Sequence, residues 1–375
     1  MQNTVYLEPE NLSTIPSIFF ESDIYKCSAS LKDKEELANF RAIIACFLNY
    51  KNDSYIEFNK RKWDLSQIKE EQLKLLQINP IKRSDELVEL LKYNQGFFNC
   101  VVDQYFSLFD FNTNPNIHFK ITQSNRKKII TLLRQFNREW GSLGIEERDQ
   151  SFLPILEELE TAYKNTKGVK VLVPGCGLGR LPFEIAQLGF DCQGNEFSYF
   201  MLLGSALVLN RLSEPLIIYP FIHKFSNNKT EKKNFTMVQI PDQPLETLPD
   251  GVDFSMTAGE FVEVYRDQKE QWDCVVTCFF IDTAKNVLDY IDVIYDILKP
   301  GGRWINLGPL LYHYSDTLTE ISVELSAEEL RQYISAKGFE FSTEQWVKSK
   351  YCAEPDNMLE SIYNCWFFSC VKKLK

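Results

Sequence analysis

Apolar residues in the first part of the chain recur every three or four positions, which is the spacing of one face of an α-helix. Such stripes run over residues 37–48, 87–109 and 129–140, and Ser84 stands where it could cap the second helix. The pattern predicts a helical N-terminal region, residues 1–160, whose amphipathic helices pack their apolar faces together.

From about residue 168 onward, short β-branched runs alternate with helical stretches. This order is typical of a parallel sheet whose connecting helices cover both faces. We therefore predict that residues 161–375 form an α/β domain with a mostly parallel sheet and an antiparallel C-terminal strand. Strands are predicted at 169–174, 190–194, 272–280 and 303–307, a helix at 284–298, and a terminal hairpin at 339–346 and 364–371.

The composition favours a globular protein and argues against a membrane-spanning or nucleic-acid-binding one. The 375 residues are 44% apolar, enough for a large core, but the apolar runs fall far short of the roughly 20 residues that span a membrane. The net charge of -11 disfavours a nucleic-acid partner. Ten irregularly spaced cysteines indicate buried thiols in a reducing compartment, so we expect a cytoplasmic protein, with the nucleus as a second location. No paired metal ligands stand out, and the polar stretch 226–234 is interpreted as a solvated loop.

A glycine-rich turn follows the first predicted strand. Gly175, Gly177 and Gly179 occupy alternate positions between this strand and the next helix. Glycine permits left-handed backbone conformations and lets a ligand lie against bare peptide groups. The pattern predicts a nucleotide-type binding turn, and the alternative is a plain connection between a strand and a helix.

The spacing of these glycines also bears on the ligand. Dinucleotide enzymes use GxGxxG, in which a later glycine brings helix and strand together over a pyrophosphate, whereas this chain has GxGxG. S-adenosylmethionine carries no phosphate and suits a tighter turn. Glu196, which follows the second strand 21 residues after Gly175, is placed to accept hydrogen bonds from both ribose hydroxyls. We therefore predict S-adenosyl-L-methionine as the cofactor.

Later strand ends should face the same crevice, because ligands of an open α/β sheet bind beyond the carboxyl ends of its strands. Glu260 and Phe261 follow the segment 254–259 and are placed to contact adenine, unless Glu260 is only a surface acid at a helix start. Asp282 follows a long apolar run, and its alternative role is to cap the next helix. His313 follows the next strand and lies near Asp282 if the two strands are neighbours, although a histidine can equally be structural.

Several longer strings of the chain are unusual enough to compare with known families. These strings are Gly175-Cys-Gly-Leu-Gly-Arg180, Gln193-Gly-Asn-Glu-Phe-Ser198, Tyr219-Pro-Phe-Ile-His-Lys-Phe-Ser-Asn-Asn228, Phe254-Ser-Met-Thr-Ala-Gly259, Cys278-Phe-Phe-Ile-Asp-Thr-Ala284 and Asn306-Leu-Gly-Pro-Leu-Leu-Tyr-His313. Over roughly residues 125–372 the chain resembles the carnosine N-methyltransferase family, and Leu298-Lys-Pro-Gly-Gly302 resembles the class I methyltransferase fold.

The resemblance implies a Rossmann-like class I methyltransferase that transfers a methyl group from S-adenosylmethionine to the imidazole Nπ of carnosine, giving anserine. The further cofactor residues that it implies are Gln135, Arg138 and Cys278. The substrate residues that it implies are Asp282, His313 and Tyr363. For Gln135 and Arg138 the alternative is an exposed helical face. The expected partner is a small imidazole dipeptide, and a homodimer is one option for the oligomeric state.

The chemistry of imidazole explains why a carboxylate is needed. The neutral ring has a lone pair on one nitrogen and a proton on the other, so the tautomer decides which nitrogen is methylated. A carboxylate such as Asp282 that accepts the Nτ–H leaves Nπ bare and stabilises the positive charge that grows on the ring. Other histidine-containing peptides or a protein histidine are alternative acceptors. A non-catalytic scaffold that only binds the cofactor is the alternative from another class.

Overall fold

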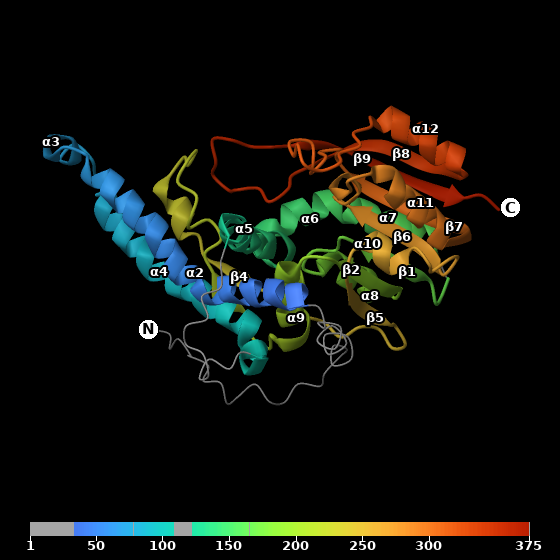
Figure 1. Cartoon of the computed structure of the whole chain (residues 1–375), viewed down its shortest axis with the longest axis horizontal. Helices are drawn as coiled ribbons and strands as arrows, with labels where there is room; N and C mark the ends of the chain where they lie inside the picture. Colours follow the sequence, from blue (N-terminus) through green and yellow to red (C-terminus); the bar gives the residue numbers. More distant parts are fainter. Residues whose placement is uncertain (1–33, 78, 109–121, 165, 375) are drawn as a thin grey trace.

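The computed structural model describes residues 34–77, 79–108, 122–164 and 166–374. Its largest element is a seven-stranded sheet with the order β5-β2-β1-β6-β7-β9-β8 (Figure 1). Strand β9 runs antiparallel to both of its neighbours, and the other pairings are parallel. The strands are β1 (Lys170–Pro174), β2 (Asp191–Glu196), β5 (Phe254–Ala258), β6 (Trp272–Cys278), β7 (Leu298–Gly308), β8 (Phe339–Ser349) and β9 (Tyr363–Lys372).

Helices cover both faces of this sheet. Successive residues of a strand point to opposite sides, and in the central strands both sets are apolar and pack against helices. In β6, Val275 packs with residues of α11, whereas its neighbours Cys274 and Val276 pack with residues of α7 and α8. The prediction of a mostly parallel α/β sheet with an antiparallel C-terminal strand is confirmed. The helices beside the sheet are α7 (Leu153–Ala162), α8 (Arg180–Gln187), α10 (Phe261–Tyr265), α11 (Val287–Ile297) and α12 (Ala327–Lys337).

A second group of elements forms its own hydrophobic core. Helices α2 and α4 lie side by side and extend away from the sheet, with α3 at their far end (Figure 1). Their core also includes residues of α5, α9 and the two-stranded ribbon β3–β4, so the segment after β2 contributes to it. The elements are α2 (Lys34–Ser66), α3 (Glu70–Leu73), α4 (Pro80–Val102), α5 (Gln123–Trp140), α6 (Ile145–Ser151), α9 (Tyr199–Arg211), β3 (Leu216–Ile218) and β4 (Val238–Ile240).

Three local expectations were wrong. Helix α4 is capped by Asn79, whose side chain accepts two backbone N–H groups, and Pro80 then starts the helix because its fixed φ suits the first turn, so Ser84 lies inside the helix. Helix α11 begins at Val287 rather than 284, because Asn286 caps its start, and it ends at Ile297 because Leu298 already belongs to β7. The polar stretch 226–234 is not simply solvated, because its last two residues, Lys233 and Asn234, are buried.

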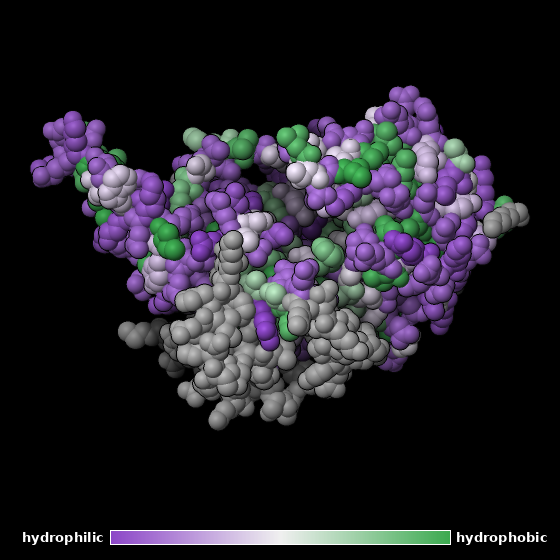
Figure 2. Space-filling model, in the orientation of Figure 1, coloured by the Kyte–Doolittle hydropathy of each residue, from purple (hydrophilic) through white to green (hydrophobic). Residues whose placement is uncertain are grey.

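Among the described residues on the face seen in Figure 2, hydrophilic ones predominate, and they include the tip of the α2–α4 hairpin. In the described part of the chain, no helix combines the length and apolar character that crossing a membrane requires.

A buried polar network fixes the helical hairpin to the segment after β3. The Asn94 amide donates to the Tyr50 hydroxyl oxygen (2.9 Å) and exchanges hydrogen bonds with the backbone of Tyr219. Tyr50 in turn contacts His223 Nε2 at 2.9 Å, and His223 Nδ1 lies 3.0 Å from Glu57. Because the Glu57 carboxylate can only accept, the His223 Nδ1 carries a proton toward it, and in the neutral ring Nε2 then accepts from the Tyr50 hydroxyl.

Removing the Tyr50 hydroxyl should therefore destabilise the fold. In Tyr50→Phe the buried groups of Asn94 and His223 lose a partner, and we expect the free energy of unfolding to fall by about 1–3 kcal/mol. Urea denaturation measures this change. Tyr55→Phe, on the same helix and only half-buried, is the control. Equal stability of the two variants would contradict this account of the network.

Candidate active site

A cavity of about 770 Å³ opens at the carboxyl ends of β1, β2, β5 and β6. This volume lies within the usual range for small-molecule sites. The predicted residues that line it are Gln135, Arg138, Gly175, Gly177, Glu196, Glu260, Phe261, Cys278 and His313. Gly179, Asp282 and Tyr363 are not among the lining residues, so the cavity brings together most, but not all, of the residues that the sequence singled out.

The glycine turn is shaped by close contacts as well as by its backbone. Gly175 and Gly177 have φ values of 65° and 59°, in the left-handed region that favours glycine. A Cβ on Gly175 would lie 2.2 Å from the Phe280 ring, and one on Gly177 would lie 2.5 Å from Glu139 Oε1. Gly179 immediately precedes α8, and a Cβ there would meet core side chains, so it serves the packing of the turn.

Glu196 lies at the end of β2, where its carboxylate binds the backbone. It accepts hydrogen bonds from the N–H groups of Gly177 (3.0 Å), Phe197 (2.8 Å) and Ser198 (2.7 Å). Burial raises the pKa of this carboxyl group, while the three N–H groups oppose the shift. A carboxylate has about four acceptor positions, so three bonds leave capacity for a ligand hydroxyl such as that of a ribose.

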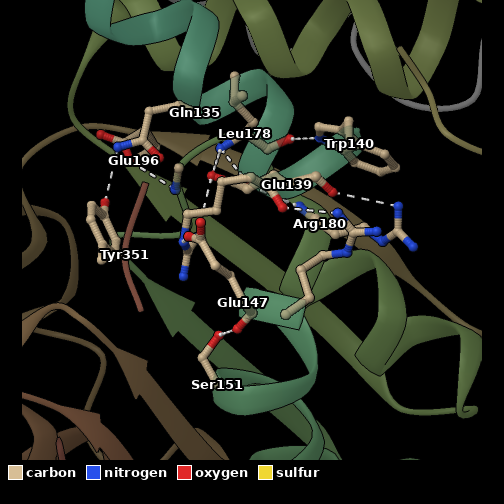
Figure 3. A network of polar contacts seen from close by, with 12 residues as sticks. Gln135, Glu139, Trp140, Glu147, Ser151, Leu178, Arg180, Glu196 and Tyr351 are labelled. Atoms are coloured by element: carbon tan, nitrogen blue, oxygen red, sulfur yellow. Dashed lines mark hydrogen bonds and ion pairs between the residues drawn. The ribbon is translucent and has the colours of Figure 1, made fainter. Parts of the chain in front are cut away.

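A second buried carboxylate, Glu139, was missed by the sequence analysis. It lies near the end of α5, lines the cavity and accepts the N–H of Leu178 with both oxygens, at 3.1 and 3.0 Å (Figure 3). The N–H of Arg180, at the start of α8, also points to it. Burial raises the pKa of Glu139 to about 7, against the opposing effects of Arg138 and these N–H groups. In the sequence it is one acid among others on an amphipathic helix, and no motif marks it.

Gln135 and Arg138 project from α5 into the cavity, and both are buried, so their alternative role on an exposed helical face was wrong. The Gln135 amide donates to the Tyr351 hydroxyl at 3.0 Å, as Figure 3 shows. The Arg138 guanidinium lies 4.6 Å from the centre of the Tyr351 ring and 3.7 Å from Glu147. Arg138 Nε has no hydrogen-bond partner within the described residues.

The Arg138 Nε–H, which has no hydrogen-bond acceptor among the described residues, tests whether the cofactor fits. A buried N–H without an acceptor is costly, and a carboxylate in the cavity would satisfy it. S-adenosylmethionine has such a carboxylate, as well as a ribose for Glu196. The residues of this cavity therefore suit the cofactor that the glycine spacing predicts.

The adenine end of the predicted site lies at the start of α10. Phe261 is buried, with its ring packed edge-on against Phe280 and Tyr290, and it lines the cavity. Glu260 caps α10 by accepting the N–H of Glu263 at 2.9 Å, and it lines the cavity too. The alternative given for Glu260 was a surface acid at a helix start; the structure places it at the start of α10 and also in the cavity wall.

Asp282 and His313 come together at one side of the cavity. The His313 N–H donates to the Asp282 carbonyl oxygen at 3.0 Å, and the buried Asp282 carboxylate accepts the N–H of Leu311 at 2.9 Å. Burial raises the pKa of Asp282, and the Leu311 N–H and His313 oppose this shift. Asn286 caps α11, so the alternative role of Asp282 as that cap was wrong.

Aromatic rings connect this corner to the C-terminal strands. Phe279 lines the cavity, and its ring centre lies 6.0 Å from that of Tyr363 and 4.7 Å from that of Tyr351. Tyr363 starts β9, and Tyr351 follows the end of β8. Cys278, the last residue of β6, also lines the cavity, and burial raises the pKa of its thiol to about 11, while Arg138 opposes this shift. Among the described residues, no group of His, Cys, Asp or Glu side chains could hold a metal ion.

The chain is similar to known proteins in sequence and in structure. The sequence profile of a family described as carnosine N-methyltransferase matches residues 115–374. A carnosine N-methyltransferase of Mus musculus is 38% identical over 352 residues, covering 91% of this chain and 88% of its own length. One of Schizosaccharomyces pombe is 34% identical over 360 residues, covering 90% and 96%. A solved S-adenosylmethionine-dependent methyltransferase of Methanosarcina mazei aligns with a TM-score of 0.39 and 13% identity, covering 60% of this chain and 100% of its own.

The strand order, with an antiparallel β9 between β7 and β8, and the glycine turn at the end of β1 define a class I S-adenosylmethionine-dependent methyltransferase. S-adenosylmethionine is the cofactor of this class. Within it, the chain belongs to the carnosine N-methyltransferase family.

The pKa of Glu139 predicts a pH dependence of stability. Since its pKa in the folded state, about 7, exceeds the value of 4.5 for an unperturbed carboxyl group, the folded state holds more protons between these values. The contribution of Glu139 to the free energy of unfolding should therefore decrease as the pH rises from about 5 to 8. Urea denaturation across this range should show a smaller decrease in Glu139→Gln than in the wild type. Glu146→Gln, at an exposed site, should behave like the wild type; a slope in Glu139→Gln equal to that of the wild type would contradict the assignment.

Proposed function

We propose that this protein transfers a methyl group from S-adenosylmethionine to the Nπ atom of the imidazole ring of carnosine, giving anserine. The observation that supports this most is the backbone hydrogen bond that brings Asp282 and His313 together beside a cavity that suits the cofactor. The relatives at 34–38% identity carry the name carnosine N-methyltransferase, which supports the same substrate.

The cofactor, when bound, supplies a methyl group on a sulfonium that is already activated for transfer. The chain then needs mainly to hold the two reactants in line, which alone can lower a barrier by roughly 7–11 kcal/mol. On the cofactor side, Arg138 and Gln135 would bind its carboxylate, Glu196 its ribose and the Phe261 ring its adenine. Because Glu139 binds the N–H groups of the turn, the backbone beside the cofactor is held in one conformation.

On the substrate side, Asp282 would select the tautomer. The Leu311 N–H binds one carboxylate oxygen, Oδ2, and so orients the group, which keeps capacity to accept the Nτ–H of the substrate ring. Nπ then carries the free lone pair. As methyl transfer places a positive charge on the ring, the carboxylate stabilises it and can accept the Nτ proton when the product becomes neutral. His313 and Tyr363 would hold the ring or the polar groups of the dipeptide.

Carnosine also agrees with the overall properties of the chain. The net charge of -11 supports a small-molecule substrate rather than a nucleic acid. The described cysteines are free thiols, which supports our inference of a location in the cytoplasm, with the nucleus as a second one. A homodimer stays a prediction.

The substrate is tested by incubating the purified protein with labelled S-adenosylmethionine and a panel of acceptors: carnosine, other histidine-containing dipeptides, and a peptide with an internal histidine. We expect transfer to carnosine, with fragmentation of the product placing the methyl group on Nπ. Transfer to another acceptor but not to carnosine would reassign the substrate. Cofactor binding without transfer to any imidazole compound would favour a non-catalytic scaffold.

The role of Asp282 can be separated from cofactor binding. Asp282→Ala removes the carboxylate, and Asp282→Asn keeps an oxygen for the Leu311 N–H while removing the charge. We expect both variants to bind S-adenosylhomocysteine as the wild type does, and turnover to fall at least about 100-fold. Calorimetry and a product assay measure the two effects. Normal turnover in either variant would remove Asp282 from the mechanism.

A further inference from the structure

The stretch that was expected to be solvated contains the most buried lysine of the described chain that forms an ion pair. The Lys233 side chain is 0% exposed, and its ammonium group lies 2.5 Å from Glu354 Oε2. The other oxygen of Glu354 faces two more cations, Lys224 and Arg134, each at 3.4 Å. One carboxylate therefore joins α5 and the segment between β3 and β4 to the loop that contains Glu354.

This loop, residues 350–362, connects β8 to β9 and is bound to the same segment by its backbone. The Lys229 N–H donates to the Asp356 carbonyl at 3.1 Å, and the Met358 N–H donates to the Asn227 carbonyl at 2.6 Å. The Asn357 amide donates to Glu354 itself at 3.2 Å. Residues 354–358 of the loop are thus held by hydrogen bonds and do not project freely into solvent.

The beginning of the loop reaches the cavity. Tyr351 lines it, with its hydroxyl on the Gln135 amide and its ring over the Arg138 guanidinium. Two residues further on, the Ala353 N–H donates to Glu147, the carboxylate that also faces Arg138. Glu354 follows directly, so its anchor lies three residues from the side chain that closes the cavity beside the predicted cofactor residues.

The charges make Glu354 the critical member of this anchor. Burial alone would raise its pKa, but Lys233, Lys224 and Arg134 together lower the pKa below its usual value and keep the group ionised. A buried ammonium needs a paired carboxylate, because an uncompensated charge in the interior is strongly unfavourable. Lys233 and Glu354 therefore depend on each other: the buried ammonium needs the carboxylate, and the carboxylate keeps the loop in contact with Lys233.

We propose that Glu354 is a positioning residue for methyl transfer: by binding Lys233, Lys224 and Arg134 it fixes the β8–β9 loop so that Tyr351 closes the cavity over Arg138 and Gln135. Glu354 itself does not contact the reactants and acts through Tyr351. The inference rests on the proposed function only for the identity of the substrate.

The same loop offers a matched control. Glu360 pairs with Lys350 at 2.7 Å, but its side chain is 56% exposed, and an exposed ion pair contributes little. Glu354→Gln and Glu360→Gln thus remove the same charge from the same loop, once at the buried anchor and once at the surface.

Three measurements test this: amide hydrogen exchange for the loop, the Kd for S-adenosylhomocysteine for the cofactor site, and steady-state kinetics for the reaction. In Glu354→Gln we expect faster amide hydrogen exchange over 350–362, and increases of about tenfold in the Kd for S-adenosylhomocysteine and in the KM for carnosine. Because the catalytic groups are intact, kcat should change much less than KM. Glu360→Gln should match the wild type in all three. Wild-type exchange and affinity in a folded Glu354→Gln protein would overturn the proposal.

A second variant covers the case in which Glu354→Gln does not fold. In Glu354→Gln with Lys233→Met, no unpaired ammonium remains in the interior, so the protein should fold while the anchor is still lost. We expect this double variant to keep the fast exchange and the weak S-adenosylhomocysteine binding; wild-type values would overturn the proposal. Neither readout needs carnosine as acceptor, so a wild type that fails to methylate carnosine rejects the proposed function and leaves the role of Glu354 to be judged separately.

Discussion

Two consecutive residues of α5 hold both backbone polar groups of one residue in the glycine turn, Leu178. Glu139 accepts the N–H of Leu178, and the Trp140 indole donates to the carbonyl oxygen of Leu178 at 3.0 Å. The turn belongs to the sheet, whereas α5 belongs to the helical core, so the two parts of the chain meet at the point where the cofactor is expected. The cavity therefore exists only when the helices are packed on the sheet, and α5 is as much a part of the cofactor site as the turn itself.

The remaining walls of the cavity follow from this contact. Once α5 is fixed, Gln135 and Arg138 face the cavity, and Tyr351 from the C-terminal strands can pack on both. Asp282 and His313 are fixed differently, by a backbone hydrogen bond between them and by the Leu311 N–H on the Asp282 carboxylate, in the segments that follow two adjacent parallel strands. The cofactor side of the site thus depends on contacts between distant parts of the chain, and the substrate side on the geometry of the sheet.

This difference explains what the sequence could predict. The strands, the glycine turn and Asp282 were found because strand ends can be located from local patterns and all meet at one edge of the sheet. Glu139 and Lys233 could not be found that way, since their importance comes from burial against partners distant in sequence, and a charged residue in a polar run suggests solvent. Tyr351 has no motif of its own. The cap of α4 was misplaced because Asn79 with Pro80 competes with Ser84 for the same helix start.

The occupied N–H groups of the turn have one more consequence. In dinucleotide-binding proteins, the start of the helix after the glycine turn holds a pyrophosphate through free N–H groups. Here the corresponding donors of Gly177, Leu178 and Arg180 already bind the carboxylates of Glu196 and Glu139. A phosphate entering this position would find negative charge instead of open donors. The two carboxyl groups thus take the place that a phosphate has in dinucleotide-binding proteins, and the turn offers a phosphate no open N–H donor at these three residues.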